Sequence, residues 1–254
     1  MILDKFSLDG KVALVTGASR GLGQSIAIAL AEAGADVACH SRVDGGAGEA
    51  CERISKLGRR AVPVAGDLAE RDVPGQLVHD VVNETGRIDI LINNAGMIRR
   101  APAVDFSEED WAAVIEVNLS SVFRLSQAVG RSMIEQGSGK IVNIASLLSF
   151  QGGITVPAYT ASKSGVAGLT KAFANEWAKY NVNVNAIAPG YMVTDNTAAL
   201  RADETRNRQI MERIPAGRWG ESYDLAGAAV FLSSSASDYV HGHILVVDGG
   251  WMAR

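Results

Sequence analysis

Three polar side chains in the second half of the chain have the types and spacing of an acid–base group with an orienting hydroxyl. Tyr159 and Lys163 are four residues apart, and a helix that opens near Pro157 would place both on one face. The Lys163 ammonium would then favour the Tyr159 phenolate and lower its pKa. Such a tyrosine can exchange a proton with an alcohol near neutral pH. Ser146, at the end of an apolar run, could hold the same oxygen atom.

A glycine-rich turn near the start of the chain fits the binding of a phosphate group. Gly17, Gly21 and Gly23 follow the β-branched run Val12–Thr16 and precede an apolar helical stretch. Glycine permits a close approach of the backbone, and a helix N-terminus offers free N–H groups to a pyrophosphate. The spacing is Gly-x-x-x-Gly-x-Gly, unlike the commoner dinucleotide fingerprint. The alternative is a strand-to-helix turn that merely uses glycine.

Seven short apolar runs, most of them separated by longer helical stretches, must position these groups. This alternation indicates βαβ units and a parallel sheet with right-handed crossovers. The expected strands are Val12–Thr16, Val37–His40, Ala61–Ala65, Ile88–Asn93, Ile141–Ala145, Val182–Ile187 and Ile244–Val247. The polar stretch 191–220 after the sixth run has the least pattern, and a solvated amphipathic helix is its simplest interpretation.

The composition excludes several classes of protein. The 254 residues suit one α/β domain, and a net charge of -4 gives no sign of a nucleic-acid-binding surface. His40 and His79 lack metal-ligand spacing, and two cysteines do not suggest a disulfide framework. No apolar run approaches the ~18 residues of a membrane span. Asp4 and Lys5 interrupt the apolar start, so no signal peptide is expected and the cytoplasm is the default compartment.

Together these motifs resemble the short-chain dehydrogenase/reductase family over the whole chain. The resemblance implies one NAD(P)-binding Rossmann domain at residues 1–254, a doubly wound parallel seven-stranded sheet with helices on both faces. It also implies a substrate-covering segment at 191–220. The catalytic set implied is Asn118, Ser146, Tyr159 and Lys163. The cofactor set implied is Gly17, Ser19, Arg20, Gly21, Leu22, Gly23, Ser41, Arg42, Asp67, Leu68, Asn94, Ala95, Gly96, Tyr159, Lys163, Pro189, Gly190 and Thr194.

The resemblance gives each member of the catalytic set a role. Tyr159 would donate a proton to the alkoxide that forms when the nicotinamide delivers hydride to a carbonyl carbon, and Ser146 would orient that oxygen. Lys163 would also hold the nicotinamide ribose. Asn118 would anchor a water that links Lys163 to solvent. The alternative for Asn118 is a polar residue that only kinks its helix.

The residues after the second expected strand favour NADP(H) and leave NAD(H) open. An acidic residue there would bind the ribose hydroxyl of NAD, whereas Ser41 and Arg42 end this strand. Arg20, in the glycine turn, is a second cation that could reach the extra phosphate of NADP. The alternative is that these cations are only solvated.

Several segments, among them NNAGMIRR at 93–100 and VDGGWMAR at 247–254, look like the 2-dehydro-3-deoxy-D-gluconate 5-dehydrogenase branch of the family, also called 2-deoxy-D-gluconate 3-dehydrogenase. That branch is usually NAD-linked, which differs from the cofactor preference expected here. A small hexonate substrate requires a cation for its carboxylate. The candidate substrate residues are Arg99, Arg100, Ser146, Gln151 and Arg201, with Arg213 and Arg218 as weaker ones. The alternative places Arg99 and Arg100 at a surface or interface.

Two other functions stay open at this point. One is a related reductase, such as a gluconate 5-dehydrogenase or a 3-oxoacyl-carrier-protein reductase. The other is a cofactor-binding sensor without catalysis. The family resemblance also implies a homotetramer with D₂ symmetry, formed through the helices Glu108–Gln136 and Pro157–Lys179. On the second helix Val166, Leu169, Phe173 and Trp177 would supply a contact face.

Overall fold

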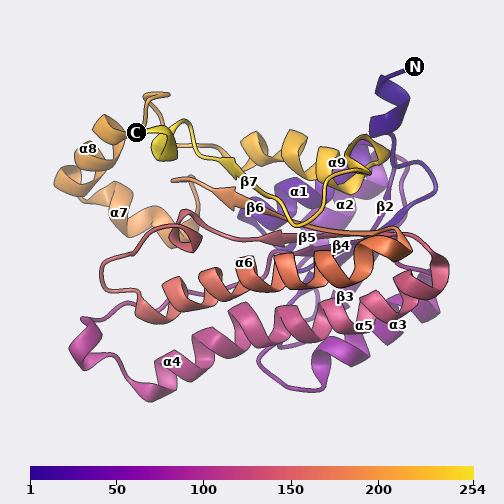
Figure 1. Ribbon diagram of the computed structural model, residues 1–254, viewed down its shortest axis with the longest axis horizontal. Helices are drawn as coiled ribbons and strands as arrows, with labels where there is room; N and C mark the ends of the chain where they lie inside the picture. The colour runs from indigo at the N-terminus through magenta and orange to yellow at the C-terminus, as the bar shows by residue number, and fades with distance from the viewer.

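The computed structural model describes residues 1–254, built on one sheet of seven parallel strands (Figure 1). The order across the sheet is β3-β2-β1-β4-β5-β6-β7. The strands are β1 (Val12–Val15), β2 (Asp36–Ser41), β3 (Ala61–Ala65), β4 (Ile90–Asn93), β5 (Gly139–Ile144), β6 (Val182–Pro189) and β7 (Ile244–Val247). All seven expected strands are present, within a few residues of the predicted bounds. The predicted doubly wound parallel sheet is therefore confirmed.

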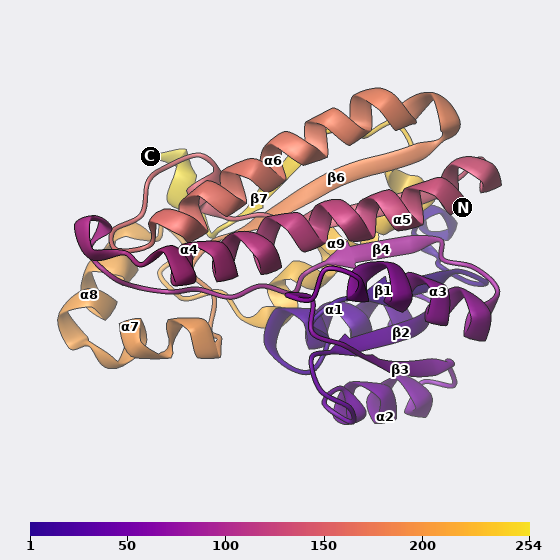
Figure 2. The ribbon, with the colours of Figure 1, turned by 90° about the horizontal axis from the view of Figure 1, so that it is seen from below.

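Helices cover both faces of this sheet, with α1, α2 and α9 on one side and α3, α4, α5 and α6 on the other (Figures 1 and 2). The helices are α1 (Gly21–Glu32), α2 (Gly48–Lys56), α3 (Val73–Thr85), α4 (Glu108–Ile115), α5 (Ser121–Gln136), α6 (Pro157–Trp177), α7 (Ala198–Ala202), α8 (Glu204–Arg213) and α9 (Ala226–Ser233). None of them combines the length and hydrophobicity needed to cross a lipid bilayer.

Alternate side chains along each strand pack into the two apolar layers of the core, one on each face of the sheet. In β1, Ala13 and Val15 pack toward α1 and α9, whereas Leu14 packs toward α3 and α5. Successive side chains of a strand point to opposite faces, so a strand buried on both sides must be apolar throughout. All four residues of β1 and all four of β4 are buried accordingly.

The order of the strands reverses between β1 and β4, which pair directly with each other. The chain leaves β1 toward β2 on one side and leaves β4 toward β5 on the other. In open α/β sheets this switch point forms a crevice beyond the carboxyl ends of the strands, where ligands bind. The glycine turn after β1 and the segment after β4 meet at this place.

The predicted helix Glu108–Gln136 is not uniform. A π-turn at Glu116–Ser120 separates α4 from α5, and Asn118 lies at its centre, fully buried. The two helices continue in nearly one line beside α6 (Figure 2). Single π-turns that interrupt an α-helix in this way are frequent at functional sites.

The contact face predicted on the helix Pro157–Lys179 is largely used inside the protein. Val166 and Phe173 are buried against the sheet, and Leu169 and Trp177 pack around the same cluster. The Phe173 and Trp177 rings stack with centroids 4.3 Å apart. These side chains therefore contribute to packing within the subunit, while Leu169 and Trp177 remain partly exposed.

The stretch after β6 contains the short helix α7 and the polar helix α8, which lie beyond the carboxyl ends of the strands (Figure 1). Ile210 and Ile214 of this stretch pack with Trp219, Trp251 and Leu147 in a separate apolar cluster. Leu147 directly follows Ser146, so this cluster joins α8 to the neighbourhood of the predicted active site. The C-terminus ends beside α8, far from the N-terminus (Figure 1).

Candidate active site

Tyr159, Lys163 and Ser146 lie together where β5 ends and α6 begins. Pro157 occupies the first turn of α6, where its missing N–H costs nothing. The helix then places Tyr159 and Lys163 on one face, with the Lys163 Nζ 5.7 Å from the centre of the Tyr159 ring. Ser146 follows β5 in an extended conformation and lies within hydrogen-bonding reach of the Tyr159 hydroxyl. The structure therefore brings these three predicted residues together.

Burial raises the pKa of the Tyr159 hydroxyl above its usual value, which is opposite to the predicted direction. A hydrogen bond with Ser146 and the positive charge of Arg100 act the other way without outweighing burial. The positive charge that offsets part of this burial comes from Arg100, and not from Lys163 as predicted.

Lys163 is a buried cation, with 5% of its surface exposed. Its Nζ donates a 2.6 Å hydrogen bond to the carbonyl oxygen of Ile144, the last residue of β5. Burial lowers its pKa from 10.5 to about 8. An ammonium without a carboxylate partner is costly to bury, so its presence points to a role that the fold alone does not require.

Asn118 uses its side chain to fix the segment after β4. Its Oδ1 accepts a 2.8 Å hydrogen bond from the Met97 N–H, and its Nδ2 donates to the Met97 carbonyl at 2.9 Å. The same Nδ2 also reaches the Ser162 hydroxyl on α6 at 3.2 Å. The amide thus joins three segments around the site, and its atoms are occupied by protein partners. A water relay at Asn118 would have to use its backbone carbonyl.

The glycine turn is held by hydrogen bonds with the segment directly after β4. The Thr16 hydroxyl accepts from the N–H groups of Asn94 and Ala95, and the Asn94 amide donates to the Thr16 and Gly17 carbonyls. A Cβ atom added at Gly23 would lie 2.2 Å from the Gly17 oxygen and 2.3 Å from the Asn94 Nδ2. Glycine at position 23 is therefore required for the turn to pack on β4.

The space above this turn suits a pyrophosphate. Gly17 and Gly21 both have positive φ, at 65° and 56°, and a Cβ at Gly21 would meet only the Thr194 methyl group, at 3.9 Å. No side chain caps the first turn of α1, so its N–H groups face the crevice without a side-chain acceptor. A dinucleotide would place its phosphates there. Ser19 and Leu22 are half-buried in the same turn.

Among the predicted adenine-side residues, some side chains are used inside the protein and one is free at the surface. Ser41 is buried and donates a 2.7 Å hydrogen bond to the Val43 carbonyl, whereas Arg42 is exposed and has no carboxylate partner. Asp67 accepts from the Ala69 N–H at 2.9 Å and shapes the turn after β3. The Leu68 side chain is buried in the core, so only its backbone can face a cofactor.

The predicted nicotinamide-side residues follow β4 and β6. A Cβ at Gly96 would lie 3.3 Å from the Asn118 Oδ1, and one at Gly190 would lie 2.6 Å from the Asp248 Cα. Pro189 ends β6 in a buried position. Thr194 caps the short 3-10 turn that follows, in a reciprocal pair with Thr197. These close contacts let the backbone of β4 and β6 approach the same crevice.

Three arginines from different elements converge on the short segment Thr194–Asn196. Arg20 of the glycine turn pairs with Asp195 at 3.1 Å. Arg100 donates to the Asn196 carbonyl at 3.3 Å, and Arg201 of α7 donates to the Thr194 carbonyl at 3.4 Å. The Nε of Arg201 is buried without a partner.

The two adjacent arginines that were predicted to bind substrate therefore differ. Arg99 pairs with Asp110 of α4 at 3.1 Å, whereas Arg100 has no carboxylate partner and its charge reaches Tyr159. Gln151 is half-buried near Ser146, in the loop before α6. Arg213 stacks on the Trp251 ring at 4.0 Å and Arg218 pairs with Asp224, which removes both from the site. Arg20 pairs with Asp195, but both side chains are largely exposed, so this ion pair is weak.

Sequence reasoning missed one residue at the crevice and the contacts of another. Thr16 belongs to the stretch that resembles the family's nucleotide loop, but the sequence does not predict that its hydroxyl holds the segment after β4. The sequence assigns no role to His40, whose ring contacts both Gly17 and Gly66. Their position at the carboxyl ends of β1 and β2, beside the glycine turn, was the available signal.

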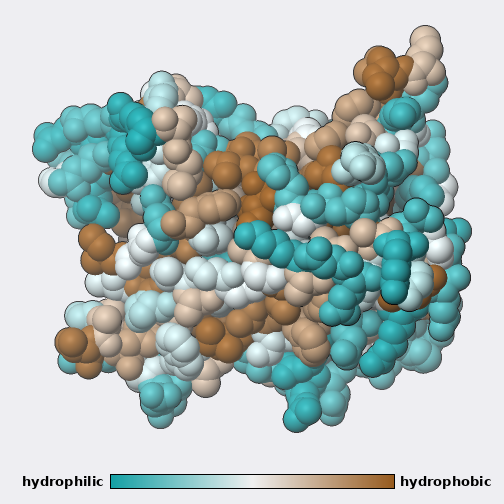
Figure 3. All heavy atoms as spheres, viewed as in Figure 1, coloured by the Kyte–Doolittle hydropathy of each residue, from teal (hydrophilic) through white to brown (hydrophobic).

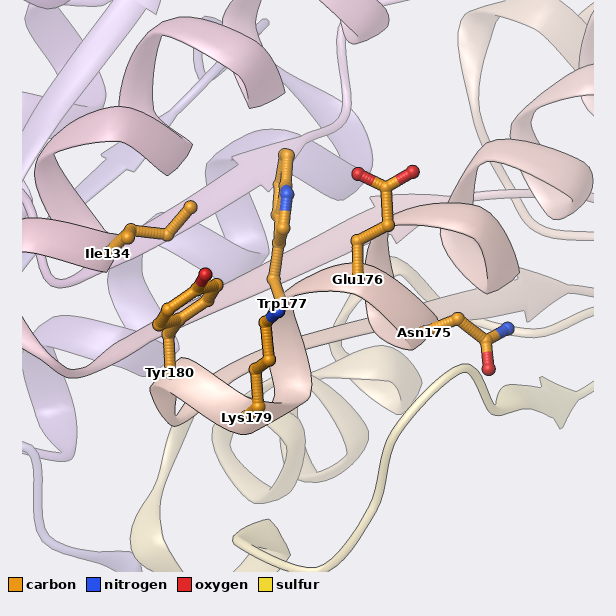
Figure 4. A pocket seen from close by; sticks show the side chains of 6 residues that line it. All are labelled: Ile134, Asn175, Glu176, Trp177, Lys179 and Tyr180. Atoms are coloured by element: carbon orange, nitrogen blue, oxygen red, sulfur yellow. The ribbon is translucent and has the colours of Figure 1, made fainter.

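A separate shallow hollow lies at the far end of α6 (Figure 4). It measures about 380 Å³ and is lined by Ile134, Asn175, Glu176, Trp177, Lys179 and Tyr180. Eighteen residues of α6 separate Trp177 from Tyr159, which corresponds to roughly 27 Å along the helix axis. The hollow is therefore unrelated to the crevice at the carboxyl ends of the strands.

Comparison with known proteins agrees with this geometry. The sequence model described as short chain dehydrogenase matches residues 11–205. A relative from Escherichia coli (strain K12), named 2-dehydro-3-deoxy-D-gluconate 5-dehydrogenase, is 58% identical over 255 residues that cover 100% of both chains.

Two solved structures are also similar. One from Agrobacterium tumefaciens with bound NADP is 59% identical, covers 99% of this chain and 100% of its own, and has a TM-score of 0.92. A gluconate 5-dehydrogenase from Burkholderia cenocepacia J2315, in complex with NADP and tartrate, is 42% identical, covers 100% of both chains and has a TM-score of 0.96. The chain therefore belongs to the short-chain dehydrogenase family.

Proposed function

We propose that the protein is an NADP(H)-dependent oxidoreductase that interconverts a ketone and a secondary alcohol on a small sugar acid, a keto-deoxy-hexonate such as 2-dehydro-3-deoxy-D-gluconate. The observation that carries this proposal is the position of Arg100. Its guanidinium has no carboxylate partner and lies close enough to Tyr159 for its charge to act on the hydroxyl. A proton donor within the field of a cation that lacks a carboxylate partner suits a substrate that carries both a carbonyl and a carboxylate.

Each residue of the site then has a task in the proposed reaction. A bound nicotinamide cofactor supplies or accepts the hydride. Tyr159 donates its proton to the developing alkoxide, and Ser146 orients the same oxygen by a hydrogen bond. Arg100 binds the carboxylate and, by its charge, offsets part of the burial that raises the pKa of Tyr159. Lys163 holds the ribose, and its pKa of about 8 lets it pass protons near neutral pH.

Arg42 supports NADP(H) as the preferred cofactor. Its side chain is exposed at the end of β2 and lacks an acidic partner, and no carboxylate ends that strand. Arg20 is a second cation at the glycine turn, and its ion pair with Asp195 is exposed and weak. Two similar proteins bind NADP, which agrees with this preference. The activity with NAD(H) should be measured beside that with NADP(H).

The assignment of a sugar acid rests on the names of the relatives and on the arginines. Arg201 contributes a further guanidinium on α7, at the edge of the segment 191–220 that we propose covers the substrate. The similar gluconate 5-dehydrogenase holds tartrate, a small hydroxy acid with carboxylates. A 3-oxoacyl-carrier-protein substrate fits less well, because the helix α8 above the crevice is strongly polar.

The test is a turnover screen with NADH and NADPH against keto-hexonates, gluconate, an uncharged ketone and an acyl-thioester. Wild type should turn over a keto-deoxy-hexonate best, and Tyr159→Phe should bind NADP⁺ normally without turnover, because only the transferable proton is lost. Turnover confined to the acyl-thioester would contradict the substrate class. Cofactor binding without any turnover would favour a sensor instead.

We also propose a cytoplasmic homotetramer with D₂ symmetry. Hydrophobic residues gather over the edge strand β7 and along α5 (Figure 3), and Trp111 and Phe123 of the α4–α5 face are 41% and 40% exposed. Light scattering at micromolar concentration should give four times the mass of 26.7 kDa, and a monomeric mass would contradict the tetramer.

A further inference from the structure

We propose that His40 is a positioning residue for the cofactor, which locks the glycine turn to the adenine side of the crevice through a neutral imidazole ring. The proposal rests on the cofactor binding proposed above. His40 lies next to the end of β2, with only 2% of its surface exposed. Its ring is one of the few polar groups in this part of the core, and both of its nitrogen atoms have partners.

The two partners fix the tautomer. The Nδ1 accepts a hydrogen bond from the Gly17 N–H at 3.2 Å, and the Nε2 lies 2.9 Å from the Gly66 carbonyl oxygen. A carbonyl can only accept and an N–H can only donate, so the proton must be on Nε2 and Nδ1 must be bare. The His40 carbonyl also accepts from the Ala18 N–H at 2.8 Å.

These contacts join the two turns that a dinucleotide would bridge. Gly17 opens the turn whose N–H groups face the pyrophosphate, and its φ of 65° is one that few other residues adopt. Gly66 precedes Asp67 in the turn after β3, on the adenine side. The ring therefore spans the distance between both turns and holds the Gly17 N–H away from the crevice, which fixes which amides remain free for a phosphate.

The charge state of the ring is part of this function. Burial lowers the pKa of His40 below its ordinary value. The hydrogen bond to the Gly66 carbonyl and the negative charge of Asp67 raise this pKa, but their effect is smaller than that of burial. At neutral pH the ring is accordingly uncharged. A second proton would sit on Nδ1 and face the Gly17 N–H, so two donors would oppose each other. Acidification through this pKa should therefore displace the glycine turn.

Two substitutions separate the two contacts. His40→Asn keeps an acceptor at the position of Nδ1 and loses the contact with Gly66, whereas His40→Gln places its amide near the position of Nε2 and loses the acceptor for Gly17. His40→Leu loses both. We expect the dissociation constant of NADP⁺ to rise by roughly 2- to 12-fold in His40→Gln, the effect of one hydrogen bond, and by more in His40→Leu. His40→Asn should stay nearest to wild type. His79→Asn, on the exposed face of α3, is the matched control.

The measurement is NADP⁺ binding by calorimetry between pH 5.5 and 8, for wild type and each variant. The ratio of wild-type to variant dissociation constants cancels the titration of the cofactor's own phosphate. For His40→Gln this ratio should approach one as the pH falls through the pKa of His40, because the charged wild-type ring then also lacks an acceptor for the Gly17 N–H. A ratio that is constant with pH, or a His40→Leu variant that binds as wild type does, would overturn the proposal.

Nitrogen NMR of the wild-type ring supplies a readout that needs no variant. In cofactor-free protein the spectrum should show a neutral ring protonated on Nε2 at pH 7, with the His40 signals shifting on addition of NADP⁺. A ring protonated on Nδ1, or charged at pH 7, would overturn the proposal even if cofactor binding is intact. Failure of wild type to bind NADP⁺ at all would instead contradict the proposed function.

Discussion

Replacement of Arg100 by Gln should separate substrate recognition from cofactor binding, and Arg99→Gln is its matched control. Arg100 has no carboxylate partner and acts on Tyr159, whereas Arg99 pairs with Asp110 at 3.1 Å on the exposed surface. A charge-assisted hydrogen bond contributes ~1.5–3 kcal/mol, so kcat/KM for a keto-hexonate should fall by about 10- to 150-fold in Arg100→Gln. An exposed ion pair contributes ~0–1 kcal/mol, so Arg99→Gln should lose less than about fivefold.

Initial rates with a keto-hexonate and with an uncharged ketone, at saturating NADPH, measure this difference. The loss in Arg100→Gln should be mainly in KM and should largely disappear for the uncharged ketone, with the NADP⁺ dissociation constant unchanged. A residual fall in kcat, smaller at high pH in the oxidative direction, would reflect the lost charge at Tyr159. Equal losses for both substrates, or a larger loss in Arg99→Gln, would refute the assignment of Arg100 to the carboxylate.

Three further outcomes are expected. Arg42→Asp should reverse the preference for NADPH over NADH in kcat/KM, by roughly 10- to 150-fold or more, because it removes a cation and adds repulsion; an unchanged ratio would place the phosphate elsewhere. Lys163→Met should lack turnover yet unfold at a higher temperature at pH 7. Burial lowers the pKa of Lys163 from 10.5 to about 8. Between pH 8 and pH 10.5 the unfolded chain therefore binds more protons than the folded one, so the wild-type protein becomes more stable as the pH rises through this range. The advantage of the variant, up to ~3 kcal/mol at pH 7 before the lost hydrogen bond to Ile144 is counted, should therefore shrink above pH 8 in thermal unfolding curves. Gly23→Ala should cost ~1–3 kcal/mol of unfolding free energy because its Cβ would overlap the Gly17 oxygen, whereas Gly168→Ala, with nothing within 4 Å, should not destabilise the protein.

Most of the sheet could be predicted because its strands are buried on both faces and therefore read as short apolar runs. The strand β3 and the edge strand β7 were located to the residue. The π-turn at Glu116–Ser120 could not be predicted, because it depends on the amide of Asn118 pairing with the Met97 backbone, a contact between distant segments. Local propensity alone favours one continuous helix there.

The site shows the same division between local and distant contacts. The spacing of Tyr159 and Lys163 follows from helix geometry and was predictable, as was the proximity of Ser146 at a strand end. The electrostatics were not, because the cation acting on Tyr159 comes from Arg100, 59 positions earlier in the sequence. Likewise the contact between Arg20 and Asp195 was not predictable, because it forms only where the segment after β6 returns to the glycine turn.

The π-turn makes the length of the α4–α5 helix as important as its composition. A π-turn holds one residue more than an α-helical path of the same length, so removal of any one residue from 116–120 would restore a straight α-helix. A π-turn takes up its extra residue locally, so the helices on either side of it keep their faces in register. The shortened helix would therefore leave α4 and α5 on their present faces and remove only the widened turn from which the Asn118 amide contacts Met97. A single-residue deletion elsewhere in α4 or α5 would instead rotate one part of the helix by about 100° relative to the other, because each residue of an α-helix turns the chain by that angle.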